Sequence, residues 1–259
     1  IITIHGSELL RFCSNPFGKI LFKRFLKKSR RIHVLSHYNK TALLKLVPEV
    51  EERVLLFPGA PARRLTGKGV RKSLRKDEKI KILCVGRIHP RKGQDRLLDA
   101  ISKLPDRLTR NIQCLLVGPV VKRKFYKKLK KIAGDLNCQI SFLGDLKDEE
   151  LRNVYQEVDL FVMPSMPREK SVEGFGFVYL EAASHGLPVI AHETGGVKDA
   201  VRQGENGFLI NPDKPDALME CLSKLIENDA LREEMGNQGL KWASSHSWEE
   251  VAMQLYSGN

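Results

Sequence analysis

Short apolar runs alternate with helix-length amphipathic segments over most of this 259-residue chain, and this alternation restricts the fold more than any other feature. Runs such as Ile82–Val85, Ile112–Val117 and Leu160–Met163 are rich in branched residues and too short for helices, as buried strands are. Nearly every run ends in Gly, Pro or a charged residue, and a helical segment follows. This order predicts an α/β fold with a doubly wound parallel sheet, in which ligands bind beyond the carboxyl ends of the strands.

A change in composition divides the chain. Residues 62–79 are polar, basic and poor in large apolar side chains, which is typical of a linker. Before them stand three short strand-like runs at 1–4, 32–35 and 53–57. We therefore expect a partial N-terminal α/β domain (1–61), a linker (62–79), a Rossmann-like C-terminal domain (80–246) and the start of a last helix (247–259).

The segment from Ser165 to Gly186 has the composition of an anion-binding loop. A strand stops at Pro164, a loop with Gly174 and Gly176 follows, and a helix begins near Phe177. A helix start of this kind presents unpaired backbone N–H groups and a positive dipole end, which suit a phosphate. Two carboxylates, Glu173 and Glu181, bracket the predicted phosphate position.

Two cations follow another strand of the same predicted sheet. Arg87 and Lys92 lie just past the strand, beside Gly86 and Gly93, and could neutralise a diphosphate, although surface charge explains such a pair equally well. Thr194-Gly195-Gly196 adds another close-approach loop.

The acidic residues suit sugar-like groups. Glu181 could accept hydrogen bonds from vicinal hydroxyls such as those of a ribose. Glu173 could do the same for a sugar ring, or stabilise positive charge that develops near a leaving group.

The segment from Phe17 to Arg31 is a basic amphipathic helix with two interpretations. Ile20, Leu21, Phe25 and Leu26 fit one face, and Lys and Arg surround it. Such a helix can lie on an anionic membrane, but helices that dock on a domain core are more common, so we favour docking.

Charge and motif content narrow the function. The net charge of +13 implies anionic partners. No apolar run is long enough for a membrane span and no signal peptide is visible. The five cysteines lack paired spacing, which favours reduced thiols and a cytoplasmic setting. The patterns GxxxxGK[ST], HExxH, CxxC, DxD and GxSxG are all absent, which argues against P-loop hydrolysis, a metal site and a serine hydrolase.

Residues 82–210 resemble the nucleotide-binding domain of the retaining GT-B glycosyltransferases of family 4. The matching text is VGRIHPRKG, LLVG, FLGDLKDEEL, VEGFGFVYLEAASHGLPVIAHETGGVKDAV and GENGFLI, in which EGFGFVYLE is the family's E-x7-E element. The resemblance implies a metal-independent hexosyltransferase that moves a sugar from a nucleotide sugar to an acceptor with retention of configuration. The family's usual proposal is front-face attack, in which the leaving phosphate takes the acceptor proton.

The resemblance also assigns roles to residues. Arg87, Lys92 and the backbone near Phe175 to Val178 would hold the donor diphosphate, Glu181 the ribose and Glu173 the donor sugar. The loop Gly144 to Leu146 would contact the base. The catalytic candidates are Glu173 and His5, and the donor-binding candidates are Gly86, Arg87, Lys92, Gly118, Gly144, Leu146, Phe175, Gly176, Phe177, Val178 and Glu181.

Residues 1–61 resemble the second half of the family's N-terminal domain. His5 matches the histidine that contacts the donor sugar from the acceptor side. The first half of that domain and the end of the crossover helix, which begins at Trp248, are missing. The chain thus reads as cut from a longer protein, and a fragment of this kind need not be active alone. No cofactor is expected, and GDP-mannose and a UDP-sugar both stay open as donors.

Two alternatives remain. The lysine-rich segments 19–31 and 122–131 suit a basic module that binds nucleic acid or an anionic surface, but interleaved aromatics are few and no nucleic-acid motif appears, so no nucleic-acid partner is expected. The same fold could also serve an epimerase or a phosphorylase. The expected partners are a nucleotide sugar, a sugar or lipid-linked acceptor and an anionic membrane surface, with the protein cytoplasmic or peripheral at the inner membrane face.

Overall fold

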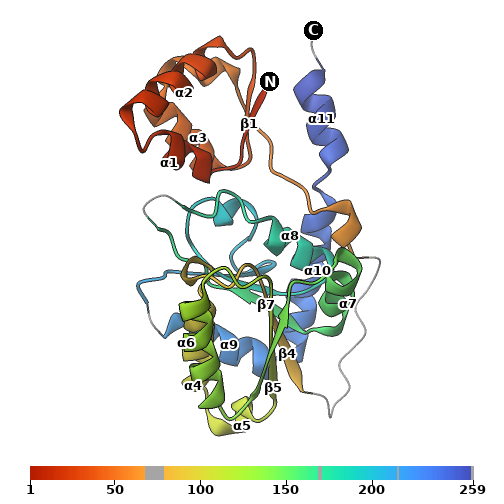
Figure 1. The fold of residues 1–259 in the computed structure, drawn as a ribbon. Helices are drawn as coiled ribbons and strands as arrows, with labels where there is room; N and C mark the ends of the chain where they lie inside the picture. The colour runs from red at the N-terminus through yellow and green to blue at the C-terminus, as the bar shows by residue number, and fades with distance from the viewer. Residues whose placement is uncertain (68–78, 169–170, 215, 258–259) are drawn as a thin grey trace.

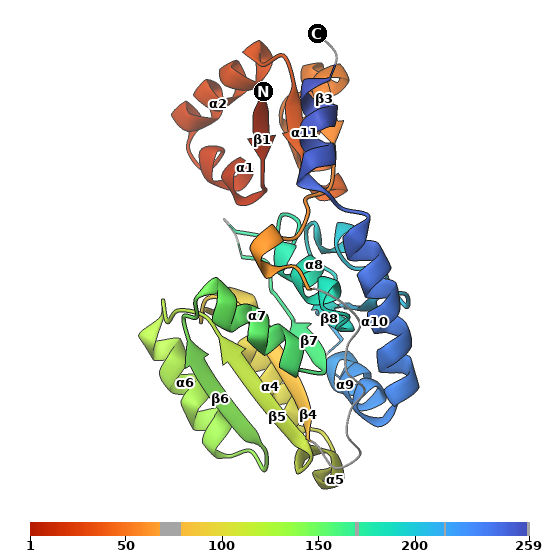
Figure 2. The ribbon, with the colours of Figure 1, turned by 90° about the vertical axis from the view of Figure 1, so that its right-hand side faces the viewer.

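The protein folds around two parallel sheets, as Figures 1 and 2 show for the computed structural model, which describes residues 1–67, 79–168, 171–214 and 216–257. The smaller sheet has the order β1-β2-β3, and the larger has the order β6-β5-β4-β7-β8-β9. The predicted α/β class with parallel sheets is confirmed. The strands are β1 (Ile2–Ile4), β2 (Ile32–Val34), β3 (Val54–Leu56), β4 (Ile80–Val85), β5 (Ile112–Val117), β6 (Gln139–Gly144), β7 (Leu160–Met163), β8 (Val189–His192) and β9 (Gly207–Ile210).

The strand order of the larger sheet reverses between β4 and β7. From β4 the chain moves outward through β5 to β6, and it then returns to the other side of β4 to add β7, β8 and β9. Because β4 and β7 are parallel neighbours, with Ile82 opposite Leu160, their carboxyl ends lie side by side. A reversal of this kind opens a crevice beyond the strand ends, where open α/β sheets bind ligands.

Helices cover both faces of the larger sheet. On one face α4 packs against α6 and α9, and on the other α8 packs against α10. Leu97, Leu98 and Ile101 of α4 are buried, as their spacing predicts. The helices are α1 (Ser7–Phe12), α2 (Pro16–Lys28), α3 (His37–Leu46), α4 (Gln94–Ser102), α5 (Asp106–Thr109), α6 (Arg123–Gly134), α7 (Asp148–Glu157), α8 (Phe177–Ser184), α9 (Ala217–Glu227), α10 (Asp229–Ser244) and α11 (Trp248–Tyr256).

Each sheet has its own hydrophobic core. Ile4, Leu26, Val34 and Leu43 belong to the cluster around the small sheet, while the larger cluster surrounds β4 to β9 and includes the buried thiols of Cys84 and Cys114, together with many other residues. The last helix, α11, lies against the N-terminal unit: Arg31 donates a hydrogen bond to the carbonyl of Leu255, and Figure 2 shows α11 in front of β3.

The expected docking face of α2 is wrong in detail. Of Ile20, Leu21, Phe25 and Leu26, only Leu26 is buried, while Ile20 is 67% and Phe25 is 59% exposed. The helix docks instead through Leu26 and the half-buried Phe22, which are one helical turn apart. The remaining apolar side chains therefore face outward.

The predicted linker is only partly described. Arg63–Leu65 form a 3-10 turn against α7, and Leu65 is buried. The Nε atom of Arg64 lies 2.8 Å from Oδ2 of Asp148 on α7. Residues 68–78 lie outside the described residues.

Candidate functional site

Three loops meet at the carboxyl ends of β4, β5 and β7, and their glycines permit the close approach. A Cβ atom at Gly118 would lie 2.3 Å from the carbonyl oxygen of Gly86, and one at Gly93 would lie 1.9 Å from that of Pro164. Both distances are too short for any side chain. The loops that carry Arg87, Lys92 and the segment after Pro164 are therefore packed together at the crevice.

The start of α8 presents unpaired amides, as the sequence predicts. Helix α8 begins at Phe177, and among the described residues no hydrogen bond is donated by the N–H groups of Phe175, Gly176, Phe177 or Val178. Gly176 caps the helix with a φ of 99°, in the left-handed region. A Cβ atom there would lie 2.4 Å from the ring of Tyr179. The loop that aims these amides thus requires glycine.

Glu173 lies directly before these amides and is held by two cations. Its Oε2 atom is 3.0 Å from Nη1 of Arg91 and 2.9 Å from Nζ of Lys92. The three side chains are 9–15% exposed. Burial alone would raise the pKa of Glu173, but Lys92 and Arg91 outweigh it and hold the pKa below its usual value. Glu173 is therefore ionised at neutral pH.

The sequence predicts Arg87 and Lys92 as the cations of the site, whereas the structure brings Arg91 and Lys92 to Glu173. Arg91 is buried in the 3-10 turn Pro90–Lys92, whereas Arg87 is exposed. The carbonyl of Arg91 accepts a hydrogen bond from the N–H of Met166, so the loops after β4 and β7 are tied together at this residue. The one signal for Arg91 in the sequence is its place directly before Lys92, where spacing alone does not separate it from a surface charge.

Glu181 lies one turn into α8. The hydroxyl of Tyr155, on α7, donates a hydrogen bond to its Oε2 atom at 3.3 Å. Burial raises the pKa of Glu181, and the bond from Tyr155 opposes that rise only in part. This carboxyl is thus less strongly ionised than Glu173.

The N-terminal unit approaches the site through the turn after β1. A Cβ atom at Gly6 would lie 2.6 Å from Cα of Gly174, and the hydroxyl of Ser36 donates to the carbonyl of Gly174 at 2.6 Å. The exposed His5 has its ring centroid 6.2 Å from that of Phe177. The structure therefore brings His5 to the first residue of α8.

The loop after β6 borders the same strand ends. Gly144 has a φ of 72°, and its carbonyl accepts a hydrogen bond from the N–H of Gly118 at 2.7 Å. Nothing lies within 4 Å of a Cβ atom at Gly144, and Leu146 is half-buried. Gly144 and Gly118 are thus hydrogen-bonded neighbours, beside Gly86.

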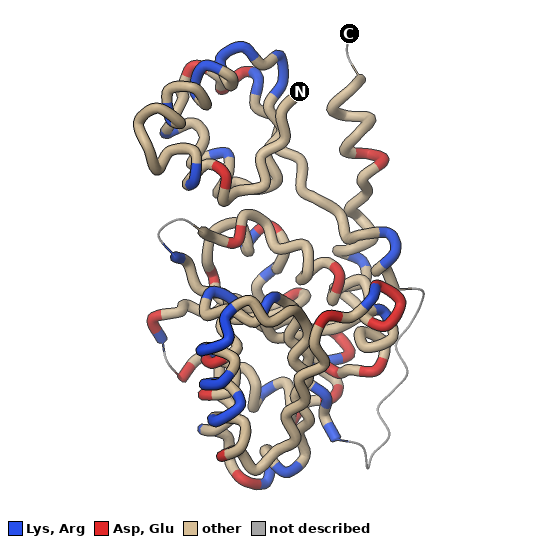
Figure 3. Tube along the Cα trace, in the orientation of Figure 1, with Lys and Arg blue, Asp and Glu red and all other residues tan. Residues whose placement is uncertain are grey.

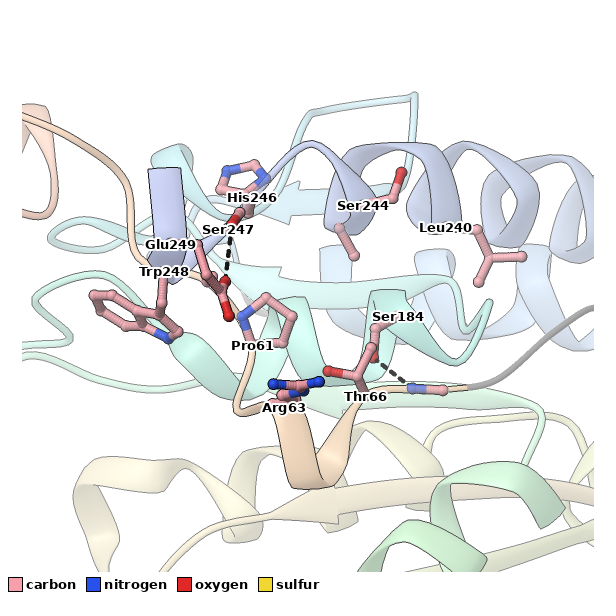
Figure 4. A pocket seen from close by; sticks show the side chains of 13 residues that line it. Pro61, Arg63, Thr66, Ser184, Leu240, Ser244, His246, Ser247, Trp248 and Glu249 are labelled. Carbon is pink, nitrogen blue, oxygen red and sulfur yellow. Dashed lines mark hydrogen bonds between the residues drawn. The ribbon is translucent and has the colours of Figure 1, made fainter. Parts of the chain in front are cut away.

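Among the described residues, no three His, Cys, Asp or Glu side chains are close enough to hold a metal ion. A pocket of about 560 Å³ lies between the turn Arg63–Leu65 and the junction of α10 with α11, where Arg63, Ser184 and Trp248 line it (Figure 4). None of the predicted site residues lines this pocket, but Trp248 in its lining packs against Phe177, with ring centroids 5.8 Å apart.

Residues 68–242 match the model of the family described as glycosyl transferases group 1. The chain is 30% identical over 254 residues to an uncharacterized glycosyltransferase of Methanocaldococcus jannaschii, covering 98% of this chain and 66% of that protein. It is 27% identical over 236 residues to a GDP-mannose-dependent alpha-(1-6)-phosphatidylinositol monomannoside mannosyltransferase of Mycobacterium tuberculosis. The match covers 89% of this chain and 59% of that protein. The chain thus spans about two thirds or less of the length of these curated relatives.

A solved structure gives the same fold. Anabaena HepE in complex with UDP and glucose superposes with a TM-score of 0.79 at 20% identity, covering 99% of this chain and 71% of that one.

Proposed function

The chain belongs to the group 1 glycosyl transferases, and from that premise we propose that its candidate site binds the nucleoside diphosphate part of a sugar donor. The reaction that we propose is transfer of the sugar to an acceptor with retention of configuration. The observation that carries the proposal is the convergence of unpaired amides at Phe175 to Val178 with Lys92 and two carboxylates at the strand reversal.

Each group at the site suits one part of the donor. The amides and Lys92 would take the diphosphate, with Arg87 in reach of solvent-facing phosphate oxygens. Glu181 would accept the ribose hydroxyls, Glu173 would face the sugar, and the loop at Gly118, Gly144 and Leu146 would border the base.

The chemistry follows from the charges that develop. When the sugar–phosphate bond breaks, negative charge grows on the leaving diphosphate, and donors already aimed at it stabilise that charge without rearrangement. The ionised Glu173 would stabilise positive charge on the sugar. His5 would approach the sugar from the N-terminal unit. On this proposal the amides and Lys92 do the work of a metal ion, so no cofactor is required.

We propose GDP-mannose or a UDP-sugar as the donor. A relative's name includes GDP-mannose and a structural neighbour holds UDP.

A lipid-linked acceptor at a membrane surface is the second part of the proposal. None of the helices in the described part of the chain is long and apolar enough to cross a membrane. On α2, however, Phe17, Ile20 and Phe25 are 59–77% exposed, and the basic residues Lys19, Arg24, Lys27 and Lys28 lie on the same helix. Exposed aromatics within a basic surface suit an anionic lipid layer, so we infer peripheral binding at an inner membrane face.

A thermal-shift experiment tests the donor site. UDP and GDP at millimolar concentration should raise the melting temperature of the chain by mass action. Replacing both Arg87 and Lys92 with Ala should remove the shift, while Arg110→Ala, an exposed change before the amino end of β5, at the opposite end of that strand from Gly118, should retain it. Absence of any shift with UDP, GDP and ADP in the wild-type chain would contradict the proposal.

A further inference from the structure

We propose that Arg91 is a positioning residue which serves as the permanent counter-ion of Glu173, so that Lys92 is free to turn from Glu173 to an incoming diphosphate. The inference rests on the proposed donor site and adds a residue to it. Arg91 itself contacts no ligand in this scheme.

Glu173 has more positive partners than its charge requires. Both Nη1 of Arg91 and Nζ of Lys92 bond to the same oxygen, Oε2, at 3.0 and 2.9 Å. The other oxygen, Oε1, accepts no hydrogen bond from any described residue. One cation can therefore leave while Oε2 stays paired and Oε1 stays available to a sugar hydroxyl.

The burial of Glu173 explains why one cation must stay. Its side chain is 15% exposed, and a buried carboxylate that loses its only cation is strongly destabilised. If Lys92 were the sole partner, any ligand that attracted Lys92 would leave that carboxylate unpaired. A second, fixed cation removes this obstacle to binding.

The surroundings indicate which cation is fixed. The backbone of Arg91 is held on both sides, because its N–H donates to Nδ1 of His89 and its carbonyl accepts from Met166. The N–H of Lys92 is also bonded, to the carbonyl of His89, but the Lys92 stem runs beside Gly86, at the crevice, with its Cδ atom 3.3 Å from a Cβ atom placed there. Lysine is a point charge on a flexible stem, whereas the arginine fork is planar and less easily redirected.

Three variants test the inference, with UDP or GDP binding to the full chain measured by calorimetry. Arg91→Met should weaken binding roughly tenfold to a hundredfold, because Lys92 is then pinned to Glu173. Adding Glu173→Gln to that variant should restore binding to within about threefold of wild type, because no carboxylate then needs a cation. Arg91→Lys should bind as wild type does, since it keeps the charge. Arg110→Met is the exposed control.

The results separate the alternatives. If the Arg91→Met/Glu173→Gln protein binds as weakly as Arg91→Met alone, Arg91 acts on the ligand directly or only supports the fold, and the inference is overturned. Wild-type affinity in Arg91→Met, or equal losses in Arg91→Lys and Arg91→Met, overturns it as well. Should Arg91→Met fail to fold by circular dichroism, the double variant decides alone, because it must bind. A wild-type chain that binds no nucleotide refutes the proposed function instead.

Discussion

At the level of single residues, the two acidic side chains of the site, Glu173 and Glu181, differ in the direction of their pKa shifts. Glu173 and Glu181 belong to one motif, yet two cations lower the pKa of Glu173, and burial raises that of Glu181. The difference comes from partners in other elements: the turn after β4 supplies Arg91 and Lys92, and α7 supplies only the hydroxyl of Tyr155. One carboxyl is thus set up to carry charge and the other to exchange hydrogen bonds.

The raised pKa of Glu181 predicts a pH-dependent stability. When the pKa of a carboxyl is higher in the folded than in the unfolded state, the free energy of unfolding of the protein falls as the pH rises from the unfolded to the folded pKa. The protein stays destabilised by this amount at higher pH. Glu181→Gln has no such titration. The variant should therefore melt a few degrees above wild type at pH 7, and the difference should vanish below about pH 4, where the unfolded carboxyl is also protonated.

Thermal melts from about pH 3 to about pH 8 measure this effect, because this range includes pH values below the ordinary pKa of a glutamate. Glu233→Gln, an exposed change on α10, is the matched control and should follow wild type throughout. An advantage of Glu181→Gln that is the same at every pH would show that the charge of Glu181 is not its cause.

At the level of elements, the start of α8 depends on one backbone conformation. Gly176 turns the chain through the left-handed region directly before the helix, and this turn leaves the preceding amides without partners. Tyr179 fills the space where a side chain at Gly176 would stand, and its hydroxyl donates to the carbonyl of Met163 at the end of β7. The helix start and the strand end are therefore fixed to each other.

Gly176→Ala should disturb both stability and binding. A left-handed alanine against the Tyr179 ring should lower the free energy of unfolding by about 1–3 kcal/mol and weaken UDP or GDP binding. Urea unfolding and calorimetry measure the two effects. Gly134→Ala, at the last residue of α6 with no atom within 4 Å of the new Cβ, should be neutral or slightly stabilising. An unfolding midpoint of Gly176→Ala equal to that of wild type would contradict this account.

At the level of the whole molecule, two basic helices lie on one side. Figures 1 and 2 place α2 and α6 on the same side, one in each unit, and Figure 3 shows Lys and Arg along both. Only α2 combines its charges with several exposed large apolar side chains. An anionic membrane would therefore attract the charges of both helices, but of the two only α2 would insert side chains into it.

Vesicle sedimentation distinguishes insertion from general attraction. The wild-type protein should sediment with vesicles that contain anionic lipid and should stay in solution with neutral vesicles. Each basic residue near an anionic surface adds about 1 kcal/mol to the binding free energy. Phe17→Ser with Phe25→Ser should abolish binding even at low salt. Lys124→Ala with Lys131→Ala on α6 should only weaken it. Equal effects of the two pairs would indicate simple charge attraction, and unchanged binding of the α2 variant would refute the role of that helix.

The sequence by itself determined the fold class and the glycine-bounded start of α8, because both depend on local signals. Alternating apolar runs and helices allow few arrangements other than parallel sheets, and glycines before Phe177 mark a helix start that can hold a phosphate.

Only the tertiary structure decided which charges meet. Arg87 and Arg91 are equally basic in the sequence, and whether either reaches Glu173 depends on how the turn after β4 packs against the loop after β7. The same holds for α2, where the contact with the small sheet selected Leu26 and left its apolar neighbours exposed. Periodicity fixes the direction of a side chain relative to its own element, but the partner it meets is set by packing between elements far apart in the chain.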